Sequence, residues 1–264
     1  MMKTIVMAVF VALTLGMADP VSAAHPLITD DTGTQGKGKF QIEMNGEYGA
    51  DKETVEGVTV KETESEASAT FSWGVTEDTD IVLGLPRRDF TIKENGAAIA
   101  SESGLSDLSL EYKHRFFEKD GLSMAVKPGI TLPTGGEERG LGTGKPSYGI
   151  LFITTKEAGP WAIHANIGYT HNEYKLQADE DANKKGIWHA SLATEVEVVK
   201  DLKAVANIGT ERNADKASDS NPAFLLGGFI YSLRENLDFD AGVKTGLSDA
   251  ETDLTVLAGV AMRF

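Results

Sequence analysis

The last twelve residues of the chain, 253–264, follow a two-residue repeat. Apolar side chains occupy every second position, and the positions between them carry mostly small or polar residues, with Leu257 as the apolar exception. The apolar set is Leu254, Val256, Ala258, Val260, Met262 and Phe264. Because side chains of a β-strand alternate between its two faces, the segment predicts a strand with one apolar face and one mixed face.

Alternation of the same kind recurs along the chain, and very little of the sequence has helical periodicity. The alternating segments are 40–48, 62–75, 81–85, 108–116, 122–132, 148–155, 161–170, 188–198, 203–212, 223–231, 237–245 and 253–264. Their connections are alternately short and long, and two of the long ones are the polar stretches 51–57 and 93–104. An even strand number and connections sorted by length are typical of outer-membrane barrels, whose closing strand often ends on an aromatic residue. We therefore expect an all-β fold, an antiparallel transmembrane β-barrel of about 12 strands with short periplasmic turns and longer extracellular loops.

Composition excludes several classes of function. The 264 residues carry a formal net charge of −15 and a pI near 4.8, which argues against a nucleic-acid partner because phosphate binding needs a basic surface. Cysteine is absent, which excludes disulfides, thiolate metal sites and a cysteine nucleophile. The histidines have no metal-ligand spacing, so we expect neither a metal site nor a cofactor. A mean hydropathy of −0.19 is compatible with strands whose apolar and polar faces average out.

The N-terminus has the features of an export signal. Lys3 precedes an apolar run over 4–17 that is too short to span a membrane as a helix, and small residues follow it. We expect a signal peptide over 1–24, with cleavage after Ala23 or Ala24. Export of a chain with this strand pattern predicts localisation to the outer membrane of a Gram-negative bacterium.

The remaining sequence divides into two parts. Residues 25–38 form a polar, glycine-rich segment that we expect on the periplasmic side, where it is a candidate plug for the barrel. Residues 39–264 form the predicted transmembrane β-barrel, and none of them belongs to an apolar run long enough for a membrane helix.

If the apolar face of each strand meets lipid, the opposite face lines a polar lumen. The candidate lumen-lining residues are Glu43, Glu47, Glu111, Lys113, Arg115, Lys127, His164, Asn166, His189, Glu195, Glu197, Asp238, Asp240, Lys244 and Arg263. In a barrel of this size the basic residues of the fourth and fifth strands lie roughly across from the acidic residues of the eighth and eleventh. Two interpretations stay open: a transverse field across an open, water-filled passage, or local pairing of these charges that fills the bore.

Aromatic residues on the apolar phase cluster near strand ends, where the rings of an outward face meet the membrane–water boundary. The predicted interface aromatics are Tyr48, Trp73, Phe116, Trp161, Tyr169, Trp188, Tyr231 and Phe264. Their shared phase supports the assignment of the apolar face to lipid.

Two motifs resemble chemical sites. Loop 140–147 is rich in glycine, but Arg139 and Pro146 stand where a Walker A motif needs glycine and a hydroxyl residue. His189 and Ser191 resemble the His-x-Ser pair of outer-membrane phospholipase, yet the phase of their strand points both into the lumen, whereas that enzyme needs them at the lipid face. We therefore expect no catalytic residues and no enzymatic activity, with a hydrolase built on this pair as the third alternative.

Several segments of the chain resemble one known family. They are 25–40 (HPLITDDTGTQGKGKF), 83–86 (LGLP), 127–135 (KPGITLPTG), 164–170 (HANIGYT) and 258–264 (AGVAMRF). Together they are similar to the outer-membrane transporter family associated with meta-pathway phenol degradation, over essentially the whole mature chain. The resemblance implies an outer-membrane barrel and passage of small organic compounds, aromatics included. The family offers no established site residues to carry over.

These observations predict a passive channel or transporter for small organic solutes that cross through a polar lumen. The competing interpretation is a barrel without transport that serves a structural or surface-interaction role. The expected partners are outer-membrane lipid, a small-molecule solute and the barrel-assembly machinery, which would engage the C-terminal strand ending at Phe264.

Overall fold

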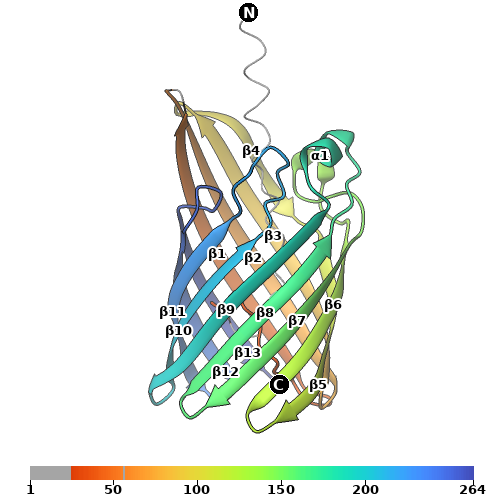
Figure 1. The fold of residues 1–264 in the computed structure, drawn as a ribbon, viewed down its shortest axis with the longest axis vertical. Coiled ribbons are helices and arrows are strands. Elements are labelled where there is room, and N and C mark those ends of the chain that lie inside the picture. Colours follow the sequence, from red (N-terminus) through yellow and green to blue (C-terminus); the bar gives the residue numbers. More distant parts are fainter. Residues whose placement is uncertain (1–24, 56) are drawn as a thin grey trace, which may run out of the picture.

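The computed structural model describes residues 25–55 and 57–264, so the predicted signal peptide over 1–24 lies outside the described residues. The chain forms one antiparallel sheet that closes on itself (Figure 1). Its strands are β1 (Phe40–Val55), β2 (Val58–Thr76), β3 (Thr79–Glu94), β4 (Ala97–Leu105), β5 (Leu108–Lys119), β6 (Leu122–Leu132), β7 (Ser147–Ala158), β8 (Trp161–His171), β9 (Gly186–Val199), β10 (Leu202–Glu211), β11 (Ala223–Arg234), β12 (Leu237–Gly246) and β13 (Leu254–Arg263). A 3-10 turn, η1 (Glu137–Arg139), and a short helix, α1 (Gln177–Ala182), lie in the connections.

Two of the strands share one position in the ring. Strand β3 pairs with β5 along 79–84 and with β4 along 87–94, so β4 continues the line of β5 beyond the break at Ser106 and Asp107. Pairing of β1 with both β2 and β13 closes the ring. The barrel therefore has 12 strand positions, and the predicted all-β barrel fold is confirmed.

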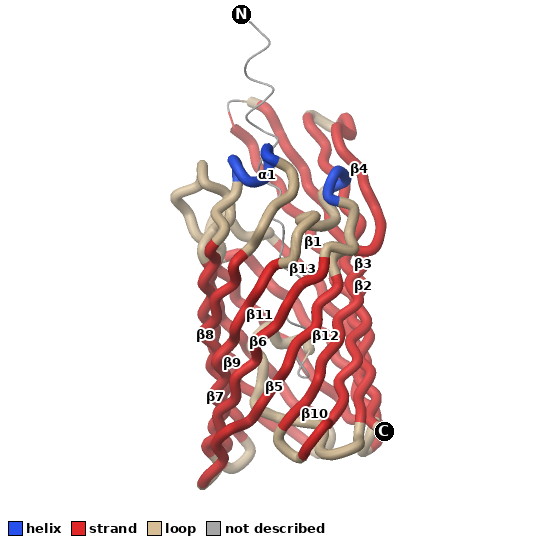
Figure 2. The backbone as a smooth tube through the Cα atoms, turned by 90° about the vertical axis from the view of Figure 1, so that its right-hand side faces the viewer, coloured by secondary structure: helices blue, strands red, loops and turns tan. Residues whose placement is uncertain are grey.

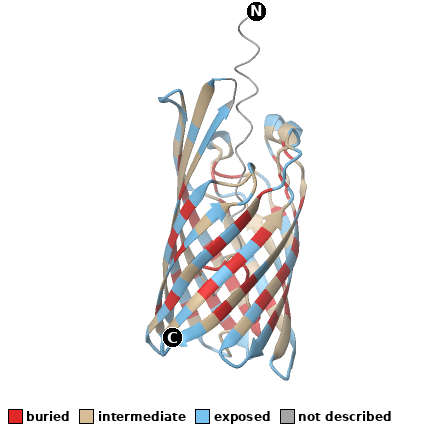
Figure 3. Ribbon diagram, turned by 60° about the vertical axis from the view of Figure 1, so that its left-hand side comes forward, coloured by how far each residue is buried: buried red, intermediate tan, exposed pale blue. Residues whose placement is uncertain are grey.

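Exposure alternates along the strands, which produces the checkered pattern of Figure 3. The large apolar side chains of the predicted lipid-facing phase are exposed, and Ile167 on β8 is the most exposed of them at 67%. The opposite face buries polar side chains such as Gln41, Glu43 and Asn207. Apolar residues therefore point outward and polar residues inward, as in membrane barrels and unlike a soluble sandwich.

The seam of the barrel is closed by an aromatic pair at one end. The Phe40 amide donates a hydrogen bond to the Phe264 carbonyl oxygen at 3.1 Å, and the Phe264 amide donates to the Phe40 oxygen at 2.8 Å. The two rings stack with their centroids 4.7 Å apart. The terminal aromatic residue of the sequence is thus a structural part of the contact between the first and last strands.

Replacement of Phe264 by alanine is expected to weaken this seam by about 0.5–1.5 kcal/mol beyond the loss of apolar area, the usual contribution of a stacked aromatic pair. Urea titration of the folded barrel in detergent, followed by the gel shift between folded and unfolded forms, measures the loss. Phe229→Ala is the matched control, because Phe229 is also exposed on the outer face of the barrel. An equal loss in both variants would contradict a special role for the seam.

The polar stretches 51–57 and 93–104 were predicted as loops, and that prediction is wrong. Strands β1 to β4 continue through them as two hairpins that extend beyond the rest of the barrel (Figure 2). Outside the membrane both faces of a strand meet water, so the apolar alternation disappears while backbone pairing persists. The turn between β3 and β4 is formed by Asn95 and Gly96, with φ values of 47° and 89°. An Asn-Gly dipeptide favours a tight hairpin turn, so these two residues were the sequence signal for the β3–β4 hairpin.

The remaining long connections lie at the same end of the barrel and are tied to one another. The Asp107 carboxylate accepts hydrogen bonds from the Gly135 and Thr143 amides, both at 2.8 Å. Lys175 donates a hydrogen bond to Glu137, which lowers the pKa of that carboxyl below its usual value. These contacts hold the loops that carry η1 and α1 together at the mouth. Over 25–55 and 57–264, no helix is long and apolar enough to span a membrane.

Candidate functional site

The N-terminal segment, residues 25–38, lies inside the barrel and runs along its inner wall. Five of its backbone amides donate to side chains of the wall, which lie in turn on strands β10, β8, β7 and β3. Ile28 and Thr29 donate to Asn207 Oδ1 at 2.8 and 3.0 Å, Asp30 to Asn166 Oδ1 at 2.6 Å, Thr32 to Thr155 Oγ1 at 3.1 Å and Gln35 to Asp80 Oδ2 at 3.0 Å. Inward-facing polar residues of the wall therefore serve as the hydrogen-bonding partners that an isolated extended segment lacks.

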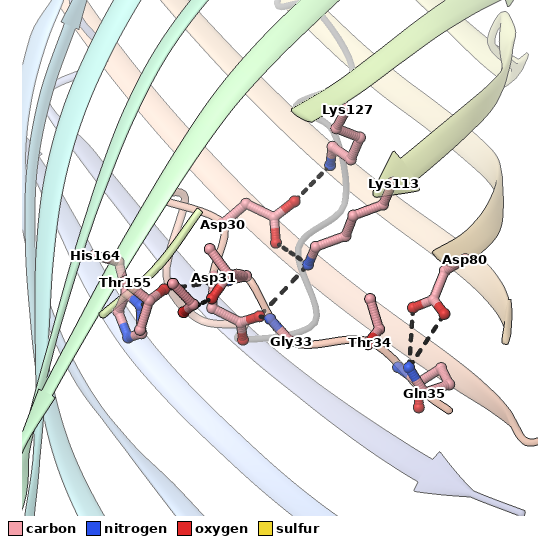
Figure 4. Close-up of polar contacts among 12 residues, drawn as sticks. Asp30, Asp31, Gly33, Thr34, Gln35, Asp80, Lys113, Lys127, Thr155 and His164 are labelled. Atoms are coloured by element: carbon pink, nitrogen blue, oxygen red, sulfur yellow. Dashed lines mark hydrogen bonds and ion pairs between the residues drawn. The ribbon is translucent and has the colours of Figure 1, made fainter. Parts of the chain in front are cut away.

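One side of the segment is anchored by charge. Asp30 Oδ1 lies 3.0 Å from Lys113 Nζ on β5, and Asp30 Oδ2 lies 2.7 Å from Lys127 Nζ on β6 (Figure 4). The three side chains are between 1% and 4% exposed. Glu111 Oε2 is 3.5 Å from Lys127 and Asp31 Oδ1 is 3.4 Å from Lys113, so further carboxylates share these two ammonium groups. Removal of one partner from such a buried arrangement leaves a charge without compensation, which is costly.

The other side is anchored by apolar contact. Leu27 packs in a buried cluster formed by inward-facing residues of strands β9, β10, β11 and β13, with Ile28 packed against it. The cluster consists of Leu27, Ala193, Val205, Phe224, Leu226, Ile230 and Leu257. Leu257, the exception in the alternation of the last strand, is only 1% exposed and belongs to this cluster. The segment is thus held between an ionic contact on one wall and an apolar contact on another.

Two cavities lie on either side of the segment. The outer cavity, of about 240 Å³, is lined by Ile28 of the segment together with Glu47 and Lys127 of the wall. The inner cavity, of about 280 Å³, is nearer the short turns and is lined by Asp31 and other residues of the segment. No residue lines both cavities. The lumen is therefore divided at the level of the segment.

Most of the predicted lumen residues lie in these cavities. Glu47, Glu111, Lys127, Asn166, His189 and Lys244 line the outer one, and Glu43, Arg115, Glu195, Asp238, Asp240 and Arg263 line the inner one. Lys113 and His164 are buried in the wall, where His164 Nδ1 is 2.9 Å from Thr155 Oγ1. Glu197 is exposed and lines neither cavity.

The lumen charges pair locally, which is the second of the two interpretations left open by the sequence. Lys203 contacts Glu195 at 2.8 Å, and Arg263 contacts Asp238 at 2.6 Å. Lys113 and Lys127 are compensated by the segment, and Arg115 contacts Asp78 at 2.8 Å, so none of the three faces the acidic residues across a free bore. This arrangement of charges does not provide a transverse electric field across an open passage.

His189 and Ser191 do not form a lipid-facing pair. His189 lines the outer cavity and lies against Gly168, and Ser191 Oγ accepts a hydrogen bond from Thr29 Oγ1 at 2.8 Å. The serine thus holds the segment in place. Within 25–55 and 57–264, no three His, Cys, Asp or Glu side chains are grouped so that they could hold a metal ion.

All eight predicted interface aromatics are exposed on the outer face. They are Tyr48, Trp73, Phe116, Trp161, Tyr169, Trp188, Tyr231 and Phe264. Tyr169 and Trp188 pair across β8 and β9 near the long loops, whereas Trp161 adjoins a short turn. Their placement is compatible with rings at both boundaries of a membrane.

Sequence reasoning missed the residues of the segment that hold it. Leu27 and Asp30 were not singled out, nor was Asn207, the partner of Ile28 and Thr29, because the polarity of 25–38 predicts no strand and gives no contact partner. The adjacent aspartates at 30 and 31, in a segment whose only other titratable side chain before Lys37 is His25, were the available signal. A second available signal was the position of Asn207 on its strand, where the alternation points its side chain into the lumen.

The fold and the divided polar lumen define a 12-stranded β-barrel of the outer-membrane type. The chain belongs to the family described as "Putative MetA-pathway of phenol degradation", whose model matches residues 25–264. The resemblance inferred from the sequence is thereby confirmed. No curated protein sequence matches this chain significantly.

Solved structures share the fold at low sequence identity. The COG4313 outer membrane channel from Pseudomonas putida F1 superimposes with a TM-score of 0.71 and 10% identity, over 89% of this chain and 98% of that chain. The translocator domain of autotransporter NalP from Neisseria meningitidis has a TM-score of 0.54 and 15% identity, over 87% and 89% of the two chains. KdgM porin has a TM-score of 0.54 and 8% identity, over 85% and 99%. These similarities establish the outer-membrane barrel fold.

Proposed function

We propose that the protein is an outer-membrane channel for small organic solutes, and that residues 25–38 act as a plug that undocks to open the passage. The observation that carries the proposal is the docked segment itself, which divides a polar lumen into two cavities. A barrel with only a structural role has no need of inward side chains placed to hold a removable segment. The names of the channel and porin with the same fold support the proposal.

The outer cavity and the family support this proposed class of solute. The cavity combines apolar side chains, including Ile28, Leu151 and Phe224, with carboxylates and hydroxyls. Such a mixture suits small organic molecules with a polar group better than bulky sugars or purely apolar compounds. The family's description links its members to phenol degradation, which makes simple aromatics the first solutes to test.

A barrel that does not transport is the second candidate, and the local pairing of the lumen charges favours it. In that case the docked segment stiffens the barrel permanently, and the linked outer loops carry the function. Both candidates place the chain in the outer membrane, and for both we propose that the C-terminal strand ending at Phe264 is the part engaged by the barrel-assembly machinery.

A reversible crosslink distinguishes the two. The chain has no cysteine, so Thr29→Cys with Ser191→Cys introduces the only thiols, at positions whose hydroxyl oxygens are 2.8 Å apart. Side chains in such contact suit a disulfide, whose Cβ atoms lie about 3.5–4.5 Å apart. In planar bilayers the oxidised variant should give no open-channel current, and reduction should restore the wild-type current.

The single variants Thr29→Cys and Ser191→Cys are the controls, and oxidation should leave the current of each unchanged because neither can form the disulfide. A current that is unchanged by oxidation would contradict the plug. No current from the wild type, together with no swelling of reconstituted liposomes in sugars, amino acids or simple aromatics, would favour the barrel without transport.

A further inference from the structure

The inner cavity has an excess of acidic groups. Seven carboxylates line it, against three lysine or arginine side chains. Each of these three already contacts a carboxylate: Lys203 contacts Glu195 at 2.8 Å, Arg263 contacts Asp238 at 2.6 Å and Arg115 contacts Asp78 at 2.8 Å. An incoming anion therefore finds its potential partners engaged, whereas an incoming cation is attracted by the remaining carboxylates.

Three buried oxygen atoms of this cavity have no hydrogen-bond partner within the described ranges 25–55 and 57–264. They are Glu43 Oε2, Asn45 Oδ1 and Asp238 Oδ1. Glu43 is 3% exposed, and Asn45 and Asp238 are each 9% exposed. All three atoms are acceptors, and buried acceptors without donors are uncommon in folded proteins because they lose hydration without compensation.

The strand register brings these acceptors to one part of the wall. Glu43 on β1 lies in register with Ala261 on β13, which lies in register with Asp238 on β12. Two residues further along, Asn45 and Asp240 flank Gly259 in the same way. At positions 259 and 261 the central strand contributes only Gly259 and Ala261, whereas Arg263 at the end of β13 contacts the other oxygen of Asp238 at 2.6 Å.

Gly259 lies where one of the three acceptors, Asn45 Oδ1, meets Asp240 and His25. A Cβ atom at this position would lie 2.5 Å from Asn45 Oδ1 and 2.6 Å from Asp240 Oδ2, and 2.7 Å from the ring nitrogen Nδ1 of His25. His25 belongs to the N-terminal segment and contacts the other oxygen of Asp240. The acceptor cluster is therefore next to the segment that divides the lumen.

We propose that Glu43, Asn45 and Asp238 form a binding site for the primary ammonium group of a small organic cation that enters from the short-turn end. A primary ammonium carries three N–H donors, which matches the three acceptors without partners. This inference rests on the proposed channel function and adds the charge of the solute: positively charged amines instead of negatively charged carboxylates.

Titration calorimetry on the full-length barrel in detergent tests the site without requiring transport. The probe is n-butylammonium, with butyrate as the probe of opposite charge and tetramethylammonium as the cation without N–H donors. We expect saturable binding of n-butylammonium alone. Glu43→Gln should weaken it about tenfold or more, because the carboxylate that accepts a charge-assisted hydrogen bond is replaced by a neutral amide with one acceptor oxygen fewer. Glu157→Gln is the matched control, since Glu157 is exposed and lines the same cavity.

A second variant leaves every charge in place. Gly259→Ala puts a methyl group into the space between Asn45 and Asp240, and it should also reduce the affinity for n-butylammonium. Thermal unfolding of each variant shows whether the barrel is intact. Equal binding of tetramethylammonium, binding of butyrate, or unchanged affinity in folded Glu43→Gln would overturn the site. Saturable binding in a barrel that passes no current would overturn the channel and leave the site standing.

Discussion

Replacement of Asp30 by alanine is expected to raise the conductance of the reconstituted barrel severalfold. In the docked state the variant would keep Lys113 and Lys127 buried with one carboxylate fewer, a loss that typically costs about 3–5 kcal/mol. In the undocked state both ammonium groups are hydrated and the loss is avoided. The equilibrium therefore moves toward the open barrel, which single-channel recording in planar bilayers detects as longer and larger openings.

Asp31→Ala is the matched control for this prediction. The Asp31 side chain is 23% exposed and lies 3.4 Å from Lys113, so its removal costs less and should change the conductance little. Deletion of 25–34 should give the same open state as Asp30→Ala. A conductance that is unchanged in both Asp30→Ala and the deletion would show that the segment does not obstruct the lumen.

Replacement of Leu192 by lysine is expected to prevent stable insertion of the barrel. Leu192 lies on β9 between Trp188 and the short turn that follows Val199, it is 50% exposed, and it pairs with Ala165 in the middle of β8. A lysine at the midplane of the lipid face costs about 2–4 kcal/mol, a large part of a typical folding free energy. Refolding into liposomes and the fraction of heat-modifiable barrel on gels measure the effect.

Val198→Lys provides the comparison on the same strand. Val198 is also 50% exposed, but it adjoins the short turn, where a lysine costs only about 0–1 kcal/mol. This variant should insert almost as the wild type does. Equal insertion of the two variants would contradict the lipid-facing assignment of this face.

The sequence predicted the barrel because a two-residue period is visible wherever one face meets lipid and the other meets the lumen. The aromatic residues Trp161 and Trp188 follow the same phase and are exposed where that phase places them. The period was lost in the hairpins over 51–57 and 93–104, because both faces of a strand beyond the membrane meet water. Their strands had to be found from turn residues such as Asn95 and Gly96.

The candidate site was less predictable, because its contacts join residues far apart in the sequence. The alternation identified Lys113, Lys127 and Asn166 as inward-facing, but it could not show that one short segment contacts all three. Leu257 looked like an irregularity in the last strand, and only the position of Leu27 explains why an apolar side chain points inward. Likewise the partners of Glu195 and Asp238 depend on the register between strands, which a single sequence does not reveal.

The path of residues 25–38 along the wall constrains the order of biogenesis. The first residue of this stretch, His25, contacts Asp240, 215 positions later, and subsequent residues contact β10, β8 and β5. The surface of the barrel wall that binds this segment is therefore complete only after the last strand has paired with the first. The segment that is synthesised before every strand would then be the last to reach its final position, and it can stabilise only barrels that have already closed.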